Sequence, residues 1–255
     1  KESGHRDNFK AVYFKDVAEG VAIIGTHLYA THDGGASWSV LDDSRDYNSI
    51  SKYVNNSVGA KVIAGTQSGE AVRVIMNNNT PFGIVPNTVS TGEVYDVYVT
   101  NNEGFAVTGD GIYYTSNVST GSWTNVDPYA IARKIRFVQD GSDLVGAFIN
   151  SSEDMHKFKL SSGTLTITTT FSNSDFSGLA VKNSSTIAAY DHLDREYYEL
   201  DASTFTFSSP VPINNTTLSS PATMLSDNNG GAWIVGKSGE IINYNGSEEN
   251  TTYNV

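Results

Sequence analysis

Cysteine is missing from this chain of 255 residues. Its absence excludes disulfide bonds, thiolate metal sites and thiol nucleophiles together. Long apolar runs are missing too, because no stretch approaches the roughly 18 apolar residues that cross a bilayer. We therefore expect no membrane insertion. No signal peptide is visible at the polar start, so we expect a mature or trimmed piece of a longer protein.

Positive charge is scarce. Lys and Arg number 16 against 28 Asp and Glu, which gives a formal net charge of −12. The basic residues are scattered singly apart from a short run at 133–136, so no basic patch is expected to neutralise phosphates. We expect no nucleic-acid partner, and anionic membrane surfaces are disfavoured for the same reason.

Helical periodicity is also lacking, because no segment keeps an apolar period of 3.6 residues over more than two turns. Runs of β-branched or aromatic residues recur instead, bounded by Gly, Asn, Asp or Pro, which is typical of short strands. Four such runs form a unit that repeats about every 40 residues. The clearest copy has its runs at 11–15, 20–25, 27–31 and 37–41.

This repeat predicts an all-β chain, a single β-propeller domain over residues 1–255 with about six four-stranded antiparallel blades. The predicted blades span residues 9–42, 48–86, 93–127, 133–170, 176–208 and 220–255. A count of five or seven blades is the alternative if the weakest runs are not strands. Either Thr251–Val255 or the segment around Phe9 would complete the sixth blade. A two-sheet jelly-roll sandwich is the alternative fold, but it does not explain the recurring unit.

One short motif has a specific pattern, S/T-x-D-x-G-x-x-W, with Thr31 as its first residue. Asp33 can accept backbone N–H groups in a turn between the third and fourth strands of a blade. Gly35 permits a positive φ in that turn, and Trp38 can bury a large ring across the hairpin. These are structural roles. His32 is expected to be a solvated turn residue.

The motif resembles the Asp-box, or BNR repeat, of sialidases, sortilin-like proteins and YCF48-like photosystem assembly factors. The stretch 11–41 resembles one complete repeat of the YCF48-like kind, and degenerate copies occur at Thr115…Trp123 and Asp227–Trp233. The resemblance implies a β-propeller in which this motif is not catalytic. Sialidases of this fold use an arginine triad, whereas this chain has six Arg and none in an Arg-Ile-Pro context. Sialidase activity is therefore not expected.

No catalytic residue, metal site or cofactor is predicted. The five His show no H-E-x-x-H or other paired spacing for zinc. No EF-hand loop, P-loop or dinucleotide fingerprint is present.

A dense polar cluster, Tyr190–Tyr198, is predicted to join the second and third strands of the fifth blade. Such turns open on the same rim as the blade-to-blade connections, where a ligand site is expected. An acid and base pair, or a site for a hard cation such as Ca²⁺, is a further interpretation of Asp191 and Asp194 that is not the favoured one. A solvated loop with local ion pairs is the alternative. The predicted ligand-binding residues of the rim are Asp110, Asp154, Asp191, His192, Asp194, Arg195, Tyr197 and Lys237.

N-x-S/T acceptor sites are about twice as frequent as chance predicts for this composition. They favour a glycoprotein on an extracellular or virion surface, and the composition is similar to that of surface proteins from thermophilic archaea and their viruses. An Asn-, Ser- and Thr-rich sequence that forms such sites by accident is the alternative. The sites lie at Asn55, Asn78, Asn117, Asn150, Asn183, Asn214, Asn215, Asn245 and Asn250.

Three functions follow from these patterns. The favoured one is a non-catalytic extracellular or virion-surface binding or adhesion domain that recognises a cell-surface glycan or a protein. The second is a glycoside hydrolase or lyase acting on surface polysaccharide, which needs two carboxyl groups about 5 Å or about 6.5–9.5 Å apart. The third is an assembly scaffold of the YCF48-like type, although the arginine-lined patch expected in those factors is missing from this acidic chain.

Overall fold

The structure is a computed structural model of the chain. It describes residues 9–55, 60–76, 82–100, 102–128, 131–172, 175–213, 223–226, 231–236, 240–244 and 248–249. None of these residues lies in a helix, and strands are the regular elements among them, so the all-β prediction is confirmed. The described residues include no helix with the length and apolar character that crossing a membrane requires.

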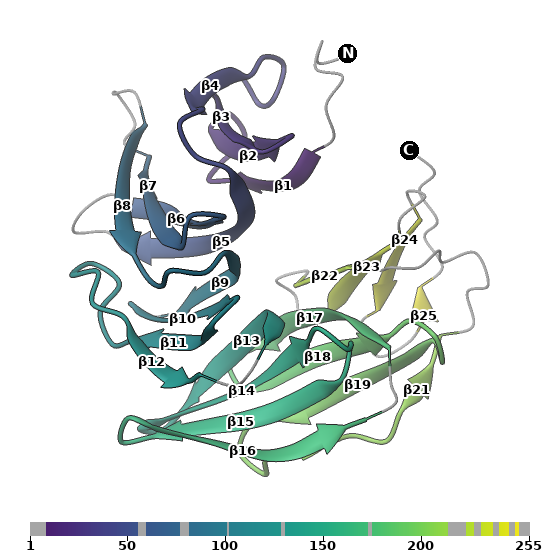
Figure 1. The fold of residues 1–255 in the computed structure, drawn as a ribbon. Coiled ribbons are helices and arrows are strands. Elements are labelled where there is room, and N and C mark those ends of the chain that lie inside the picture. The colour runs from purple at the N-terminus through teal and green to yellow at the C-terminus, as the bar shows by residue number, and fades with distance from the viewer. Residues whose placement is uncertain are drawn as a thin grey trace. The chain divides into compact units, whose positions relative to one another are not determined.

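Two compact units divide the chain, Lys1–Arg133 and Lys134–Val255. The first unit holds three antiparallel sheets, each with four strands hydrogen-bonded in sequence order (Figure 1). The strands of the first sheet are β1 (Phe9–Phe14), β2 (Gly20–Ile24), β3 (His27–Thr31) and β4 (Ser39–Asp42). Those of the second are β5 (Tyr47–Asn55), β6 (Ala60–Thr66), β7 (Glu70–Ile75) and β8 (Gly83–Thr88). Those of the third are β9 (Val94–Thr100), β10 (Glu103–Thr108), β11 (Gly111–Thr115) and β12 (Thr124–Asp127).

The second unit holds the other three sheets (Figure 1). The fourth sheet consists of β13 (Ala132–Asp140), β14 (Asp143–Asn150), β15 (Met155–Ser161) and β16 (Thr164–Phe171). The fifth consists of β17 (Phe176–Asn183), β18 (Thr186–Asp191), β19 (Glu196–Asp201), β20 (Thr206–Phe207) and β21 (Val211–Pro212). The sixth consists of β22 (Thr223–Ser226), β23 (Ala232–Val235), β24 (Ile241–Tyr244) and β25 (Glu248–Glu249). That both units form one domain stays a prediction.

The prediction of about six four-stranded sheets is confirmed, with one difference in the fifth sheet. Its outer edge is split, because both β20 and β21 pair with β19. Pro210 and Pro212 have no N–H group and cannot donate to a continuous ladder. Phe9 belongs to β1 of the first sheet, and the fourth strand of the sixth sheet is Glu248–Glu249. The strand predicted at Thr251–Val255 lies outside the described residues.

The middle sheet of each unit, the second or the fifth, is buried on both faces by its two neighbouring sheets. Successive side chains of its strands point to opposite faces and so pack against different neighbours. In β6, Val62 packs in a cluster shared with the first sheet, while Ile63 packs in a cluster shared with the third. In β18, Ile187 packs toward the fourth sheet and Ala188 toward the sixth. Strands covered on both faces are nearly continuous apolar runs. This packing explains why β6 and β18 show little polar alternation.

One edge of each unit is built by a repeated backbone contact. The turn between the second and third strands accepts a hydrogen bond from the connection to the next sheet. These bonds join Tyr47 N to Thr26 O (2.7 Å), Val89 N to Gly69 O (2.9 Å), Phe176 N to Glu153 O (2.9 Å) and Ile213 N to Arg195 O (2.8 Å). The connection in turn accepts a bond from the following turn, as between Gln67 N and Asp46 O (2.8 Å) and between His192 N and Asp175 O (3.0 Å). We call this edge, made of these turns and connections, the rim of each unit.

A buried polar network joins the first and second sheets at the rim. Asp42 is only 6% exposed and accepts hydrogen bonds from the Tyr47 hydroxyl (2.5 Å) and from Arg45 Nη1 (2.9 Å). Arg45 Nε also donates to Glu70 on β7 at 3.0 Å. Burial acts to raise the pKa of Asp42, but the hydrogen bonds from Ser44, Tyr47 and Arg45 outweigh it and lower the pKa to about 2.

Gly69 is a rim position at which a side chain has no room. Its φ is +83°, and a Cβ there would lie 2.3 Å from the Ser90 carbonyl oxygen. Gly163 has a similar φ of +81°, but a Cβ there would meet nothing within 4 Å. We expect Gly163→Ala to cost about 1 kcal/mol for its left-handed backbone, and Gly69→Ala about 3 kcal/mol or more because backbone must shift. Urea unfolding measures both, and equal costs would contradict the crowding at Gly69.

Asp42 is expected to make stability depend on acid pH. Its folded pKa of about 2 lies below the ordinary value of 3.8, so its contribution is present above the ordinary value and is lost as the pH falls through 2. The lost contribution amounts to about 2 kcal/mol. Tyr47→Phe removes one donor and should reduce stability at neutral pH by about 1.5 kcal/mol or more. Urea unfolding across this pH range tests both, and parallel curves for the wild type and Asp42→Asn would refute the assignment.

Candidate functional site

The turn between β3 and β4 is held together by Asp33. Its carboxylate accepts the Ser37 backbone N–H (2.9 Å), the Ser37 hydroxyl (2.6 Å) and the Thr31 hydroxyl (2.8 Å). The hydrogen bonds from Ser37 first, and then the one from Thr31, lower the pKa of Asp33 to about 2. The Gly35 backbone N–H donates to Thr31 Oγ1 at 2.9 Å. All of these contacts lie within the turn itself.

Trp38 closes this turn by packing on the first sheet. Its half-buried ring meets Phe9 and Phe14 of β1 edge-on, with centroids 5.7 Å and 5.9 Å away. Gly35 has a φ of +86°, and a Cβ there would lie 3.4 Å from Phe14 and 3.5 Å from Trp38. The neighbouring His32 side chain is 53% exposed. The turn therefore stabilises its own sheet.

The two weaker copies of the motif differ in their structure. In the turn between β11 and β12, the Asn117 backbone N–H donates to Thr115 Oγ1 at 3.2 Å, as that of Asp33 does to its own threonine. Trp123 follows this turn, directly before β12, and packs on the cluster shared by the second and third sheets. Trp233 instead lies within β23, the second strand of its sheet. Trp233 therefore does not hold the place that Trp38 holds in its sheet, and residues 227–230 lie outside the described residues.

Asp191 organises the rim turn between β18 and β19. Its side chain is buried at 2% exposure, and Oδ1 accepts the backbone N–H groups of Leu193 (3.0 Å) and Asp194 (3.2 Å). Oδ2 accepts the backbone N–H of Asp175 in the preceding connection at 3.3 Å. The carboxylate therefore ties together two parts of the rim. Its role as a ligand or an acid stays a prediction.

The tyrosines of the polar cluster are not exposed platforms. Tyr197 is 1% exposed, packs against Tyr244 with the two tilted rings' centroids 4.3 Å apart, and donates a hydrogen bond from its hydroxyl to Glu199 at 2.9 Å. Tyr198 donates to Glu196 at 2.6 Å, and burial followed by this hydrogen bond raises the pKa of Tyr198. Tyr197 and Tyr198 pack into the apolar clusters on the two faces of the fifth sheet.

The solvent-facing part of this turn is smaller than the sequence suggested. Leu193 is 67% exposed, Asp194 is exposed, and Arg195 is half-buried with a positive φ of 56°. In the turn between β14 and β15, Asp154 Oδ2 accepts a hydrogen bond from Asn150 Nδ2 at 3.4 Å.

Asp110 and Lys237 are two further residues that were predicted on the rim. Asp110 belongs to the first unit, where it accepts hydrogen bonds from Thr108 (2.5 Å) and Thr91 (3.1 Å). Burial acts to raise the pKa of Asp110, but these hydrogen bonds outweigh it and lower the pKa. Lys237 lies outside the described residues.

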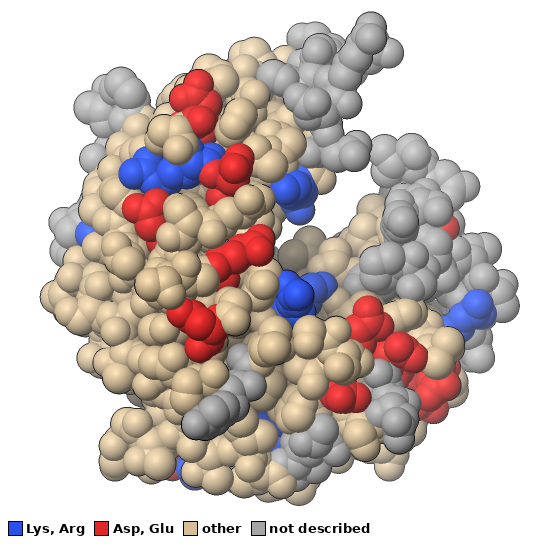
Figure 2. All heavy atoms as spheres, in the orientation of Figure 1, with Lys and Arg blue, Asp and Glu red and all other residues tan. Residues whose placement is uncertain are grey.

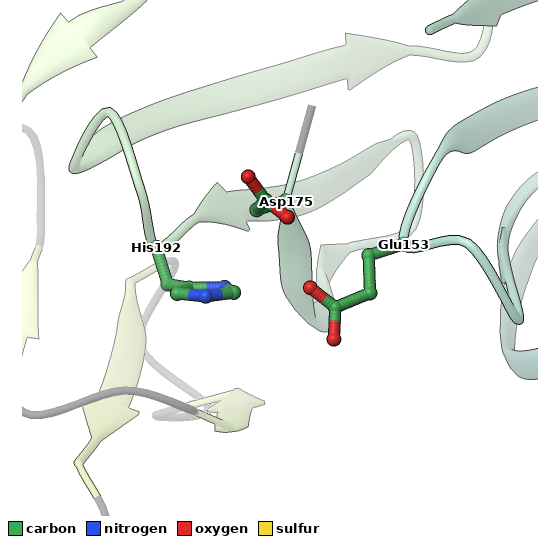
Figure 3. A group of neighbouring side chains, drawn as sticks. All are labelled: Glu153, Asp175 and His192. Atoms are coloured by element: carbon green, nitrogen blue, oxygen red, sulfur yellow. The ribbon is translucent and has the colours of Figure 1, made fainter. Parts of the chain in front are cut away.

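A second group of rim side chains was not indicated by the sequence. Glu153 from the β14–β15 turn, Asp175 from the connection before β17 and His192 from the β18–β19 turn converge (Figure 3). Their nearest ligand atoms all lie within 4.8 Å of one another. Of these three residues only His192 was predicted, and in the β14–β15 turn the predicted residue was Asp154 rather than Glu153. Asp175 could have been found from the repeat, because a connection between sheets contacts the rim turn that follows it, as Asp175 contacts His192.

The acceptor asparagines can be placed in part. Asn183 is exposed at the end of β17, and its Oδ1 accepts the Ser185 N–H at 2.9 Å. Asn117 and Asn150 are half-buried, and Asn150 Nδ2 lies 3.2 Å from His156 Nε2. The side chain of Asn55, at the end of β5, is not described. Outside the described residues lie Asn78, Asn214, Asn215, Asn245 and Asn250.

Charge on the surface follows the acidic composition. Figure 2 shows acidic side chains on both units of the face drawn, with the basic side chains in small separate groups. The formal net charge of −12 therefore acts over a broad surface, and a positively charged partner is favoured electrostatically.

Comparisons with known proteins identify the fold. No protein-family model matches the chain, and no curated protein sequence matches it. A structure of YCF48 bound to D1 peptide is similar, with a TM-score of 0.64, 12% identity, and coverage of 98% of this chain and 83% of that chain. The WD40 β-propeller domain of Doa1 gives a TM-score of 0.71 at 14% identity, covering 97% and 83%. The β-propeller domain of Myceliophteria thermophila Cps50 (Swd1) gives 0.67 at 10% identity, covering 94% and 84%. The chain therefore has a β-propeller fold, in which the six sheets are the blades.

Proposed function

We propose that this chain is a non-catalytic binding domain that takes a protein partner on the rim of its second unit. The observation that carries the proposal is the turn after β18, which presents Leu193 at 67% exposure beside the exposed Asp194. The Asp191 carboxylate fixes this turn through three backbone N–H groups. A turn already held in one conformation loses little entropy on binding, which favours recognition.

The fold comparison supports a peptide or protein as the partner. The similar YCF48 structure holds a D1 peptide, and we extend this class of partner to the present chain. With a net charge of −12, the chain is suited to a basic segment, because opposite charges guide encounter and reject wrong partners. The assembly-scaffold prediction is one form of this function.

Three of the carboxylates at the rim support binding over catalysis. Asp110, Asp191 and Glu196 each accept hydrogen bonds from their own turn or strand. A general acid or base must instead reach a proton on the substrate. These contacts disfavour the hydrolase and lyase alternative. The buried ring of Tyr197 likewise disfavours a glycan site built on exposed aromatic rings.

Two finer assignments belong to the same proposal. The hydrogen bonds from Thr31 and Ser37 to Asp33 support the resemblance of this turn to an Asp-box. The acceptor asparagines support an extracellular or virion-surface glycoprotein, with adhesion as the biological use of the binding site.

Selection of peptides from a random display library tests the partner class. We expect enrichment of basic peptides that carry apolar residues, with affinity falling as salt rises because surface charges are screened. Leu193→Ser should weaken binding at least about tenfold, since it removes the exposed anchor. The matched control is Leu225→Ser, because Leu225 is 58% exposed but lies within the strand β22 rather than in the rim turn.

Three outcomes would refute the proposal. Equal loss in Leu193→Ser and Leu225→Ser would remove the rim turn from the interface. Hits on a glycan array without peptide enrichment would replace the protein partner by a sugar. Turnover of chromogenic glycosides by the purified wild-type chain would replace binding by catalysis.

Secretion from mammalian cells behind an added leader tests the glycoprotein assignment. We expect Asn183 to carry a glycan because it is exposed, and Asn150 to remain unmodified because its Nδ2 is engaged by His156. Peptide mass spectrometry after glycosidase treatment measures both, with Asn183→Gln as the control. Occupancy at Asn150 together with an empty Asn183 would be the opposite of this expectation.

A further inference from the structure

Three side chains with metal-binding atoms meet on the rim of the second unit. Glu153 is exposed, while Asp175 and His192 are half-buried, and the ligand atoms lie within 4.8 Å of one another. In Figure 3 the His192 ring and the two carboxylates point into the space between the three loops. Ligands of one tetrahedral ion lie about 3.4 Å apart, which rotation of the exposed Glu153 side chain can reach.

The backbone under this group is held in place before any ion binds. The Phe176 N–H donates to the Glu153 carbonyl at 2.9 Å, and the His192 N–H donates to the Asp175 carbonyl at 3.0 Å. The Asp175 N–H is in turn held by the Asp191 carboxylate at 3.3 Å. The backbone of each of the three residues is therefore hydrogen-bonded to a neighbouring loop, so an ion would have to order little of the chain on binding.

The imidazole of His192 supplies an independent observation. Its Nδ1 is buried from solvent and has no hydrogen-bond partner among the described residues. A buried polar nitrogen without a partner is costly, and such atoms call for an explanation. A ligand bonded to this nitrogen supplies one.

The two carboxylates leave their negative charge uncompensated. Within the described ranges, no Lys or Arg forms an ion pair with Glu153 or Asp175, and no recorded hydrogen bond ends on either carboxylate. Two like charges at this separation repel one another, and a cation between them reverses the interaction.

We propose that Glu153, Asp175 and His192 bind one divalent transition-metal ion of the Zn²⁺ class. One imidazole nitrogen and two carboxylate oxygens are typical ligands of Zn²⁺, while Ca²⁺ and Mg²⁺ prefer oxygen alone. Three protein ligands leave room for water or for a group from a partner. The ion fastens the turn of the fourth sheet to the turn of the fifth, independently of the function proposed above.

Titration of metal-stripped wild-type protein with Zn²⁺ tests the site. We expect one ion per chain, visible absorption from Co²⁺ in the same site, and a melting temperature that rises with added Zn²⁺. Asp175→Asn, Glu153→Gln and His192→Ala should each weaken binding at least about tenfold and abolish the thermal shift.

The matched control is His32→Ala, which removes another histidine close to a carboxylate, with Nδ1 3.7 Å from Glu19. It should leave binding and the thermal shift unchanged. Asp175→Asn keeps the shape of the side chain, so its circular dichroism separates loss of a ligand from loss of fold. Absence of Zn²⁺ binding by the wild type would overturn the proposal, as would binding by all three variants with the affinity of the wild type. Displacement of Zn²⁺ by an equal concentration of Ca²⁺ would also overturn it, because that excludes the imidazole as a ligand.

Discussion

Burial on both faces is the constraint on which the rest of this structure depends. A strand such as β6 sends Val62 to one neighbouring sheet and Ile63 to the other, so no face of the strand is left for polar chemistry. Strands such as β6 and β18 therefore carry few polar side chains, and the polar groups of the rim lie in turns, connections and strand ends. A site on the rim is consequently assembled from loops that belong to different sheets.

Assembly of such a site depends on the backbone bonds of the rim. The bond from His192 N to Asp175 O and that from Phe176 N to Glu153 O fix three separate loops relative to one another. Residues distant in the sequence thus meet reproducibly, without direct bonds between their side chains. The same contacts recur in the first unit at Tyr47 and Gln67, so the rim is a property of the repeat.

The strands were predictable because each satisfies a local rule. β3 has the predicted bounds, 27–31, since its β-branched and aromatic residues are bounded by turn-forming residues. The split outer edge of the fifth sheet was not, because it depends on where Pro212 meets β19. The site was only partly predictable. Asp191 was predicted as a ligand-binding residue, but its burial and its hydrogen bond to the Leu193 N–H were not predicted, since the direction of a side chain in a turn depends on backbone angles that the sequence does not state.

Carboxylates in this chain divide by what surrounds them rather than by residue type. Asp33 and Asp42 each accept several donors, which stabilise the charged form and lower both pKa values to about 2. Their oxygens already accept hydrogen bonds from the protein itself, so few lone pairs remain for a ligand. Glu153 and Asp175 lie in similar turns, but no recorded hydrogen bond among the described residues ends on their oxygens. A carboxylate that accepts no hydrogen bond keeps its lone pairs and its negative charge available to a ligand. On this acidic surface, that difference separates a binding carboxylate from a structural one.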